Sequence, residues 1–115
     1  MLRRQTKQRP AKGRERALLF AALGDETRLG LVARLGAGEQ ASISQLTKGS
    51  RLTRQAITKH LRVLEQAGFV RCRREGRESL YALNPKPIEQ MQDYLDFVSR
   101  QWDEALDRLK AFVED

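Results

Sequence analysis

Four polar side chains repeat at helical spacing in the middle of this 115-residue chain. They follow the pattern i, i+3, i+4, i+7 on a helix face without acidic residues, and they are Gln55, Thr58, Lys59 and Arg62. Such groups suit the base edges of DNA, because Gln pairs with adenine and Lys or Arg pairs with guanine. A charged face on an isolated helix is more often only solvated surface. The neighbouring elements therefore decide between these two interpretations.

The same stretch has a second face that is apolar and must be buried. Its members follow i, i+4, i+7, and they are Ile57, Leu61 and Leu64. Thr53 is the predicted N-cap of this helix. Arg54 lies in the first turn, and helix N-termini approach phosphates and base edges. One face therefore holds the helix to the protein while the other stays available.

A shorter helix is expected just before this one. The sequence predicts it over 45–48, with Ser44 as its N-cap, and a turn over 49–52 follows. Two helices joined in this way form a helix-turn-helix, here about residues 44–67, and the second helix of such a unit enters the major groove.

A basic hairpin is predicted after the glycine at position 68. Strands at 69–74 and 78–83 are joined by a turn over 75–77, so the hairpin spans about 69–83. It brings three arginines towards its tip, namely Arg73, Arg74 and Arg77. Arginines there suit phosphates or a narrow minor groove. A helix-turn-helix with such a hairpin is a winged helix, and the predicted fold class is α+β, mostly α.

The rest of the chain forms the frame of this domain. Residues 1–13 are predicted to be a flexible basic arm, either solvated or tracking the DNA, and residues 14–115 a single domain. A helix starts at Arg14, and another follows the cap Asp25 with an inward stripe of Leu29, Val32 and Leu35. The last helix, about 87–113, carries a long seam of coiled-coil type.

Charge is unevenly distributed and predicts an anionic partner. The net charge is +7, and residues 1–16 and 48–77 are both strongly basic, whereas residues 84–115 hold eight acids and four basic residues. A single cysteine fits a reducing cytoplasm, and no segment approaches the roughly 18 apolar residues that cross a membrane. We expect a cytoplasmic protein that a second copy would help to stabilise.

Catalysis is not expected. The sequence has no Ser/His/Asp set, no phosphate-binding glycine loop and one histidine, so we predict no enzyme and no cofactor. His60 lies beside the buried stripe and is more often a packing residue than a DNA contact. Cys72 is more often a structural strand residue, although neighbouring arginines could make its thiol reactive.

The chain also resembles the ArsR/SmtB family of winged-helix transcriptional repressors. The segments "LGDETRLGLVARL", "ISQLTKGSRLTRQAITKHLRVLEQAGFV" and "RREGRESLYAL" carry the resemblance, which covers about residues 15–113. It implies a homodimer built on the first and last helices, a recognition helix bound to a palindromic operator, and an inducer that weakens binding.

The resemblance and the residue patterns together give two predicted sites. The DNA-binding set is Thr53, Arg54, Gln55, Thr58, Lys59, Arg62, Arg73, Arg74 and Arg77. The dimer interface is predicted to be formed by Leu18, Leu19, Ile88, Met91, Leu95, Val98, Trp102, Leu106 and Leu109. The partners expected are therefore double-stranded DNA, a second copy of the chain and an unidentified small-molecule inducer, with no membrane.

The sequence departs from the metal-sensing members of the family. Their Cys-x-Cys pair has no counterpart in "ISQLTKGS", and the last helix has no histidine, so we expect no metal site. The "W-x-x-x-L-x-x-L" pattern of Trp102–Leu109 is similar to that of some non-metal members. The alternatives are a winged helix that binds RNA or another protein, and a thiol-responsive regulator acting through Cys72.

Overall fold

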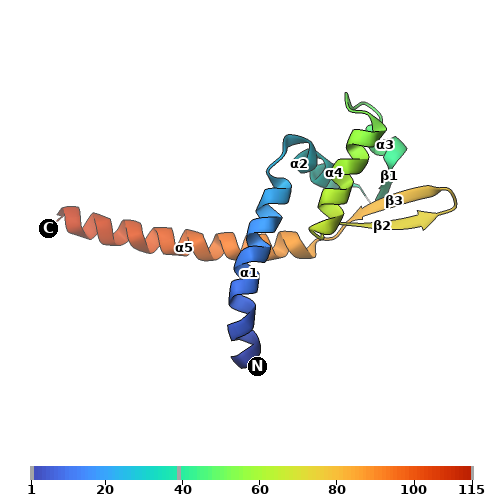
Figure 1. Cartoon of the computed structure of the whole chain (residues 1–115). Helices are drawn as coiled ribbons and strands as arrows, with labels where there is room; N and C mark the ends of the chain where they lie inside the picture. The colour runs from blue at the N-terminus through green and yellow to red at the C-terminus, as the bar shows by residue number, and fades with distance from the viewer. Residues whose placement is uncertain (1, 39, 115) are drawn as a thin grey trace.

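A computed structural model describes residues 2–38 and 40–114, and of residues 2–12 it describes the backbone only. The order of elements is α1 (Leu2–Leu23), α2 (Glu26–Ala37), β1 (Gln40–Ser42), α3 (Ile43–Thr47), α4 (Arg54–Gln66), β2 (Val70–Glu75), β3 (Glu78–Leu83) and α5 (Lys86–Glu114). Helices α2, α3 and α4 gather beside the small sheet, and most of α5 projects away from them on the opposite side (Figure 1).

Helix α1 is longer than the sequence indicated. It begins at Leu2 and not at Arg14, which corrects the helix start expected from the sequence, and the described backbone of residues 2–13 is helical. Leu, Arg, Gln, Lys and Ala dominate this segment and are all good helix formers, which favours continuation in spite of Pro10 and Gly13. The helix ends at Leu23, directly before Gly24, as predicted.

Helix α2 has the predicted cap but a rotated inner face. The Asp25 carboxylate accepts a hydrogen bond from the Arg28 backbone N–H at 3.0 Å. The buried residues are Leu31, Val32 and Leu35, whereas Leu29 is 54% exposed. The inward prediction for Leu29 is therefore wrong. Val32 and Leu35 are compatible with an inner face of α2 that includes either Leu29 or Leu31. Packing against the rest of the core buries Leu31.

The short helix α3 begins two residues earlier than expected. Its N-cap is Ser42 and not Ser44: the Ser42 hydroxyl accepts from the Gln45 backbone N–H at 3.2 Å. The Gln45 side-chain oxygen in turn accepts from the Ser42 N–H at 2.9 Å, which completes a capping box. The helix-turn-helix therefore spans Ile43 to Gln66 instead of about 44–67.

The sheet has three antiparallel strands in the order β1-β3-β2. The β2–β3 hairpin is the predicted wing, with Val70 opposite Leu83 and Glu75 opposite Glu78. Gly76 lies in its turn at φ 63°, a conformation that glycine adopts without strain. Strand β1 adds a third strand by pairing Ala41 with Tyr81, which the prediction of a two-stranded wing did not include.

The core lies where α4 meets the sheet and the first two helices. Six large side chains are almost fully buried, and they are Phe69, Leu46, Ile57, Leu61, Leu64 and Val70. The three of α4 are the predicted apolar face, which is thereby confirmed. Because this face is fixed in the core, the opposite face of α4 is held towards solvent.

Helix α5 is packed only near its beginning. Pro87 and Met91 are buried, and the Tyr94 ring lies edge-on to Phe20 of α1 with ring centroids 6.0 Å apart. The five large apolar residues of its second half are all exposed, and they are Trp102, Leu106, Leu109, Phe112 and Val113. The start of α5, up to Tyr94, therefore packs against the rest of the subunit, whereas Leu95, Phe97 and the apolar residues of the second half are exposed.

Candidate DNA-binding surface

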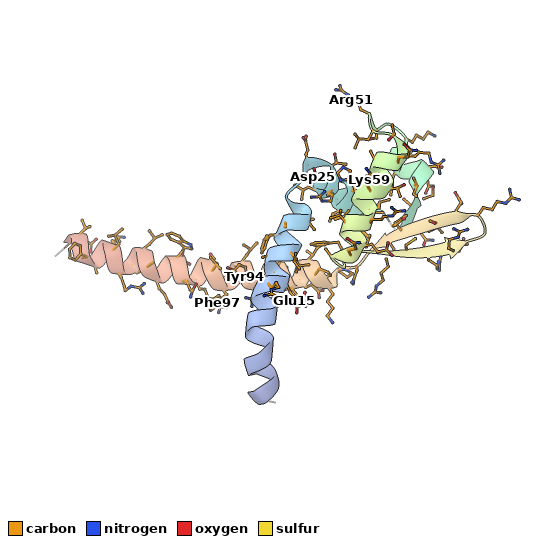
Figure 2. The ribbon with its side chains drawn as sticks, viewed as in Figure 1. Glu15, Asp25, Arg51, Lys59, Tyr94 and Phe97 are labelled. Atoms are coloured by element: carbon orange, nitrogen blue, oxygen red, sulfur yellow. The ribbon has the colours of Figure 1, made fainter. Side chains whose placement is uncertain are left out.

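The polar face of α4 forms a continuous part of the surface. Seven residues line a shallow groove there, and they are Thr53, Arg54, Gln55, Ala56, Thr58, Lys59 and Arg62. All of them are exposed except Ala56 and Thr58, which are half-buried, and none is acidic. Figure 2 shows Lys59 on α4. The structure thus brings together the six predicted residues that belong to the start and outer face of this helix.

Two hydroxyl groups of this face are fixed by the helix itself. The Thr53 hydroxyl accepts from the Ala56 backbone N–H at 3.1 Å, which confirms it as the N-cap. The Thr58 hydroxyl donates to the Arg54 carbonyl oxygen at 2.7 Å. Because the Thr58 proton is used within the helix, this side chain offers the groove a methyl group and an acceptor oxygen, but no donor.

The turn between α3 and α4 carries a cation that the sequence analysis did not select. Arg51 is exposed at the outer end of this turn (Figure 2). Gly49 in the same turn has φ 81°, which permits the tight reversal between the helices. Arg51 lies close to the start of α4, and this position in the helix-turn-helix was the signal that could have identified it.

The α3 helix is tied to α2 by one arginine. Arg34 donates from Nη1 to the Leu46 carbonyl at 3.0 Å and from Nη2 to the Gln45 carbonyl at 2.6 Å. Unpaired carbonyls at a helix C-terminus favour a cation. This contact fixes the helix-turn-helix on the body of the domain.

The three wing arginines are not equivalent. Arg73 donates to the Glu75 carboxylate at 3.0 Å and to the Gln40 side chain at 3.3 Å. Arg74 is its neighbour in β2 and so lies on the other face of the strand, opposite Ser79. Arg77 is exposed in the hairpin turn. Of the three predicted wing arginines, Arg73 therefore has an acid partner within the chain.

His60 is half-buried and is not among the residues that line the groove on α4. Its Nδ1 is 3.3 Å from Arg28 Nη1 and 3.7 Å from the Asp25 carboxylate. The Arg28 Nε also donates to the Ala22 carbonyl at 2.6 Å, which joins the end of α1 to α4. The hydrogen bond from the Arg28 backbone lowers the pKa of Asp25, and the nearby His60 and Arg28 charges act in the same direction.

Cys72 is exposed on β2 and pairs across the hairpin with Tyr81. Burial is the main cause that raises the pKa of Tyr81 to about 12, and a hydrogen bond with Cys72 adds to it. Tyr81 is therefore a neutral phenol at physiological pH. The contact with Tyr81 gives Cys72 a structural role in the wing.

The residues predicted for a dimer interface fall into two groups. Leu19 and Met91 are only 7% and 8% exposed and belong to the core of the single chain, and the half-buried Ile88 packs against that core. Val98 is half-buried. The others are exposed, and they are Leu18, Leu95, Trp102, Leu106 and Leu109. The exposed group lies on α1 and along α5.

Two features that would indicate other functions are absent from the part of the chain that the structure describes. Among residues 2–38 and 40–114, no group of three or more His, Cys, Asp or Glu side chains is arranged to hold a metal ion. None of the helices in the same part of the chain combines the length and the apolar character that crossing a membrane requires.

Comparisons with known proteins agree with this architecture. A family model described as a helix-turn-helix domain matches residues 23–73. The HTH-type transcriptional regulator YuzN of Bacillus subtilis (strain 168) is 35% identical over 79 residues, which cover 64% of this chain and 86% of YuzN. The HTH-type transcriptional regulator Rv2034 of Mycobacterium tuberculosis is also 35% identical, over 76% of this chain and 78% of that protein.

A solved structure extends the comparison to nearly the whole chain. An ArsR-like transcriptional regulator from Rhodococcus sp. RHA1 is 34% identical and has a TM-score of 0.77, with 89% of this chain and 95% of that chain covered. The winged helix, the exposed basic face of α4 and these relatives lead to one assignment. The chain belongs to the ArsR family of winged helix-turn-helix transcriptional regulators.

Proposed function

We propose that this protein is a homodimeric repressor that binds a pseudo-palindromic operator in double-stranded DNA and acts in the cytoplasm. The observation that carries the proposal is the outer face of α4, which is exposed, free of acids and furnished with amide, hydroxyl and cationic groups. The core residues of α4 hold this face outward, and so it is available to enter a major groove.

The parts of the surface have separate roles in this proposal. Gln55, Thr58 and Lys59 read base edges, and Arg54 and Arg62 flank them on the same helix. Arg51 and the wing residues Arg74 and Arg77 contact phosphates, which adds affinity without sequence preference.

The exposed stripe of α5 supports the homodimer. A monomeric protein rarely exposes a contiguous apolar patch of this kind unless another molecule covers it. With 29 residues, α5 is about 43 Å long at 1.5 Å per residue, which is enough to span the distance of about 34–36 Å between successive major grooves. Two copies joined through α1 and α5 would thus present two α4 helices to one face of the DNA.

The inducer in this proposal is not a metal ion. The chain has one cysteine and one histidine, and these lie on β2 and α4 without the further ligands that a zinc-type site needs. A small molecule or another signal would release the operator.

The double variant Gln55→Ala, Lys59→Ala tests the reading face. It should retain weak, salt-sensitive DNA binding but lose preference for the operator, because each good side-chain pair to a base contributes about 1–3 kcal/mol of discrimination. A competition assay between operator and random duplex measures this preference. The matched control is Arg74→Ala, Arg77→Ala, which should weaken binding to every sequence and reduce its salt dependence.

The same assay can contradict the proposal. If the Gln55 and Lys59 double variant kept the wild-type ratio of operator to random affinity, α4 would not be the reading element. If wild-type protein showed no preference among duplexes, the repressor function itself would be wrong.

A further inference from the structure

Three titratable or charged side chains meet where the end of α1, the start of α2 and the middle of α4 come together. They are Asp25 and Arg28 at the start of α2 and His60 of α4, and Figure 2 marks Asp25. All three residues are half-buried. His60 is the one histidine of the whole sequence, so any response of this protein that an imidazole produces belongs to this residue.

Arg28 joins the three helices through its guanidinium group. Its Nε donates to the Ala22 carbonyl at the end of α1 at 2.6 Å, and its Nη1 lies 3.3 Å from His60 Nδ1. Because a guanidinium group only donates, a hydrogen bond here requires Nδ1 to accept and the ring proton to be on Nε2. The neutral imidazole is therefore the form that Arg28 can bind, and this form ties α4 to α1 and α2.

A carboxylate lies near the same ring nitrogen. Asp25 Oδ2 is 3.7 Å from His60 Nδ1, and among the described residues no other carboxylate comes within 4.0 Å of this ring. Asp25 also accepts the Arg28 backbone N–H at 3.0 Å and is attracted by the Arg28 charge. The backbone hydrogen bond is the main reason why the pKa of Asp25 is lowered from 3.8. Asp25 therefore stays ionised throughout the pH range in which histidines usually titrate.

Protonation of His60 would exchange these two partners. A protonated imidazole has a proton on both nitrogens, so Nδ1 can no longer accept from Arg28 and the two positive charges repel each other. The same Nδ1–H can donate to the Asp25 carboxylate instead. Of the elements around this ring, α2 contributes these two charged groups and α1 the uncharged Ala22 carbonyl. On α4 itself the adjacent charged side chain is the exposed Lys59.

We propose that His60 is a proton-controlled positioning residue for the reading helix. The neutral ring, bound by Arg28, holds α4 in the orientation that prefers the operator, and the protonated ring moves to Asp25 and weakens that preference. His60 adjoins Lys59 of the reading face and Leu61 of the core, so a change of its partner acts on the helix between the two. The inference rests on the proposed reading of an operator by α4, and it adds acidification as a signal that releases the operator.

The pH dependence of sequence preference tests this switch. The affinities for the operator and for random duplex are measured at about pH 7.5 and about pH 5.5, which bracket the usual titration of histidine, at constant ionic strength. The ratio of the two affinities should fall about fivefold or more at the lower pH, as is usual for coupling between two sites. The ratio is the right measure because an added positive charge strengthens binding to every duplex.

A variant without a titratable ring separates the switch from a purely structural role. In His60→Asn the amide oxygen can accept from Arg28 in place of Nδ1 but does not titrate. This variant should therefore have the wild-type ratio at pH 7.5 and keep it at pH 5.5. The matched control is Cys72→Ser, which removes the thiol and should retain the wild-type response to pH. A wild-type response in His60→Asn would assign the effect to another group and overturn the proposal.

A second variant tests the exchange of partners without altering the ring. Asp25→Asn can still cap α2 but offers no negative charge to the protonated imidazole, so the fall in the ratio should move to lower pH. In the wild type the midpoint of this fall should coincide with protonation of the single histidine, which nitrogen NMR follows directly. An unchanged midpoint in Asp25→Asn, or two midpoints that differ in the wild type, would contradict the proposal.

The same data distinguish failure of this inference from failure of the proposed function. If the wild type prefers its operator equally at both pH values, only the switch is wrong. If it prefers no duplex at pH 7.5, the reading of an operator is itself wrong. Circular dichroism at each pH monitors the fold, and a fall in the ratio that accompanies loss of helix would also count against the switch.

Discussion

Thr58 shows how one hydrogen bond limits what a residue can read. Its hydroxyl proton is given to the Arg54 carbonyl, so its methyl group is the distinctive feature left for a base such as thymine. We expect Thr58→Val to keep the base preference at the contacted position. Thr58→Ser should relax it by about 0.8 kcal/mol, the contribution of one buried CH₂-sized group, which is roughly fourfold. Selection of binding sites from random duplexes with each variant measures this; the reverse order would mean that the hydroxyl makes the contact.

Asp25 makes the start of α2 sensitive to acid. Its pKa is lowered from 3.8, chiefly because the carboxylate accepts the Arg28 backbone N–H. A carboxyl group with a lowered pKa in the folded state adds stability that is complete above its unfolded pKa and is lost as pH falls through the folded value. The Asp25→Asn amide can still cap the helix but does not titrate, so this variant should lose less stability than wild type below about pH 4. Urea unfolding at pH 7 and pH 3 checks it, and identical pH dependence would exclude the carboxylate as the cause.

At the level of single residues, the sequence predicted those positions whose role is set by local geometry. Thr53 caps α4 because its hydroxyl meets an N–H three residues ahead, and such a contact is encoded by spacing alone. Arg73 was predicted as a wing cation near the hairpin tip, yet it contacts Gln40, which lies 33 positions earlier. Contacts of that range depend on the folded sheet, and no local pattern indicates them.

Among the elements, α3 offers the clearest test of how a helix start is chosen. Ser42 is buried and forms a capping box with Gln45, whereas the Ser44 hydroxyl, the cap expected from sequence, is exposed. Ser42→Ala should lower the free energy of unfolding by about 1 kcal/mol. Ser44→Ala should change it by less than about 0.5 kcal/mol. Chemical denaturation of both variants decides the matter, and a larger effect at Ser44 would contradict the assigned cap.

The order and type of most elements could be predicted from sequence, and their exact limits could not. The Ser-x-x-Gln pattern of Ser42 to Gln45 was a readable signal for the start of α3. For strand β1 the sequence allows a short extended piece, but three residues do not indicate which strand they will pair with, and here the partner is β3. Similarly, Val32 and Leu35 suit two orientations of α2, and packing in the folded protein selects Leu31 over Leu29.

For the whole molecule, one apolar seam serves two purposes. Its first part, around Met91, completes the core of the subunit, while its second part from Trp102 onwards is left exposed. The sequence predicted the seam correctly as an uninterrupted helical pattern, but a pattern does not distinguish a partner within the chain from one in a second copy. The proposed dimer depends on the exposed part of this seam, because buried residues such as Met91 are not accessible to another molecule.

The most direct test of the account is selection of binding sites by the purified wild-type protein from a pool of random duplexes. Two α4 helices related by two-fold symmetry should select a pseudo-palindrome whose half-sites are centred about 10–10.5 base pairs, or 34–36 Å, apart. Mass measurement of the complex should find two chains on each selected duplex. Recovery of no enriched sequence, or of an asymmetric site bound by one chain, would contradict the central claim that this protein reads an operator as a dimer through α4.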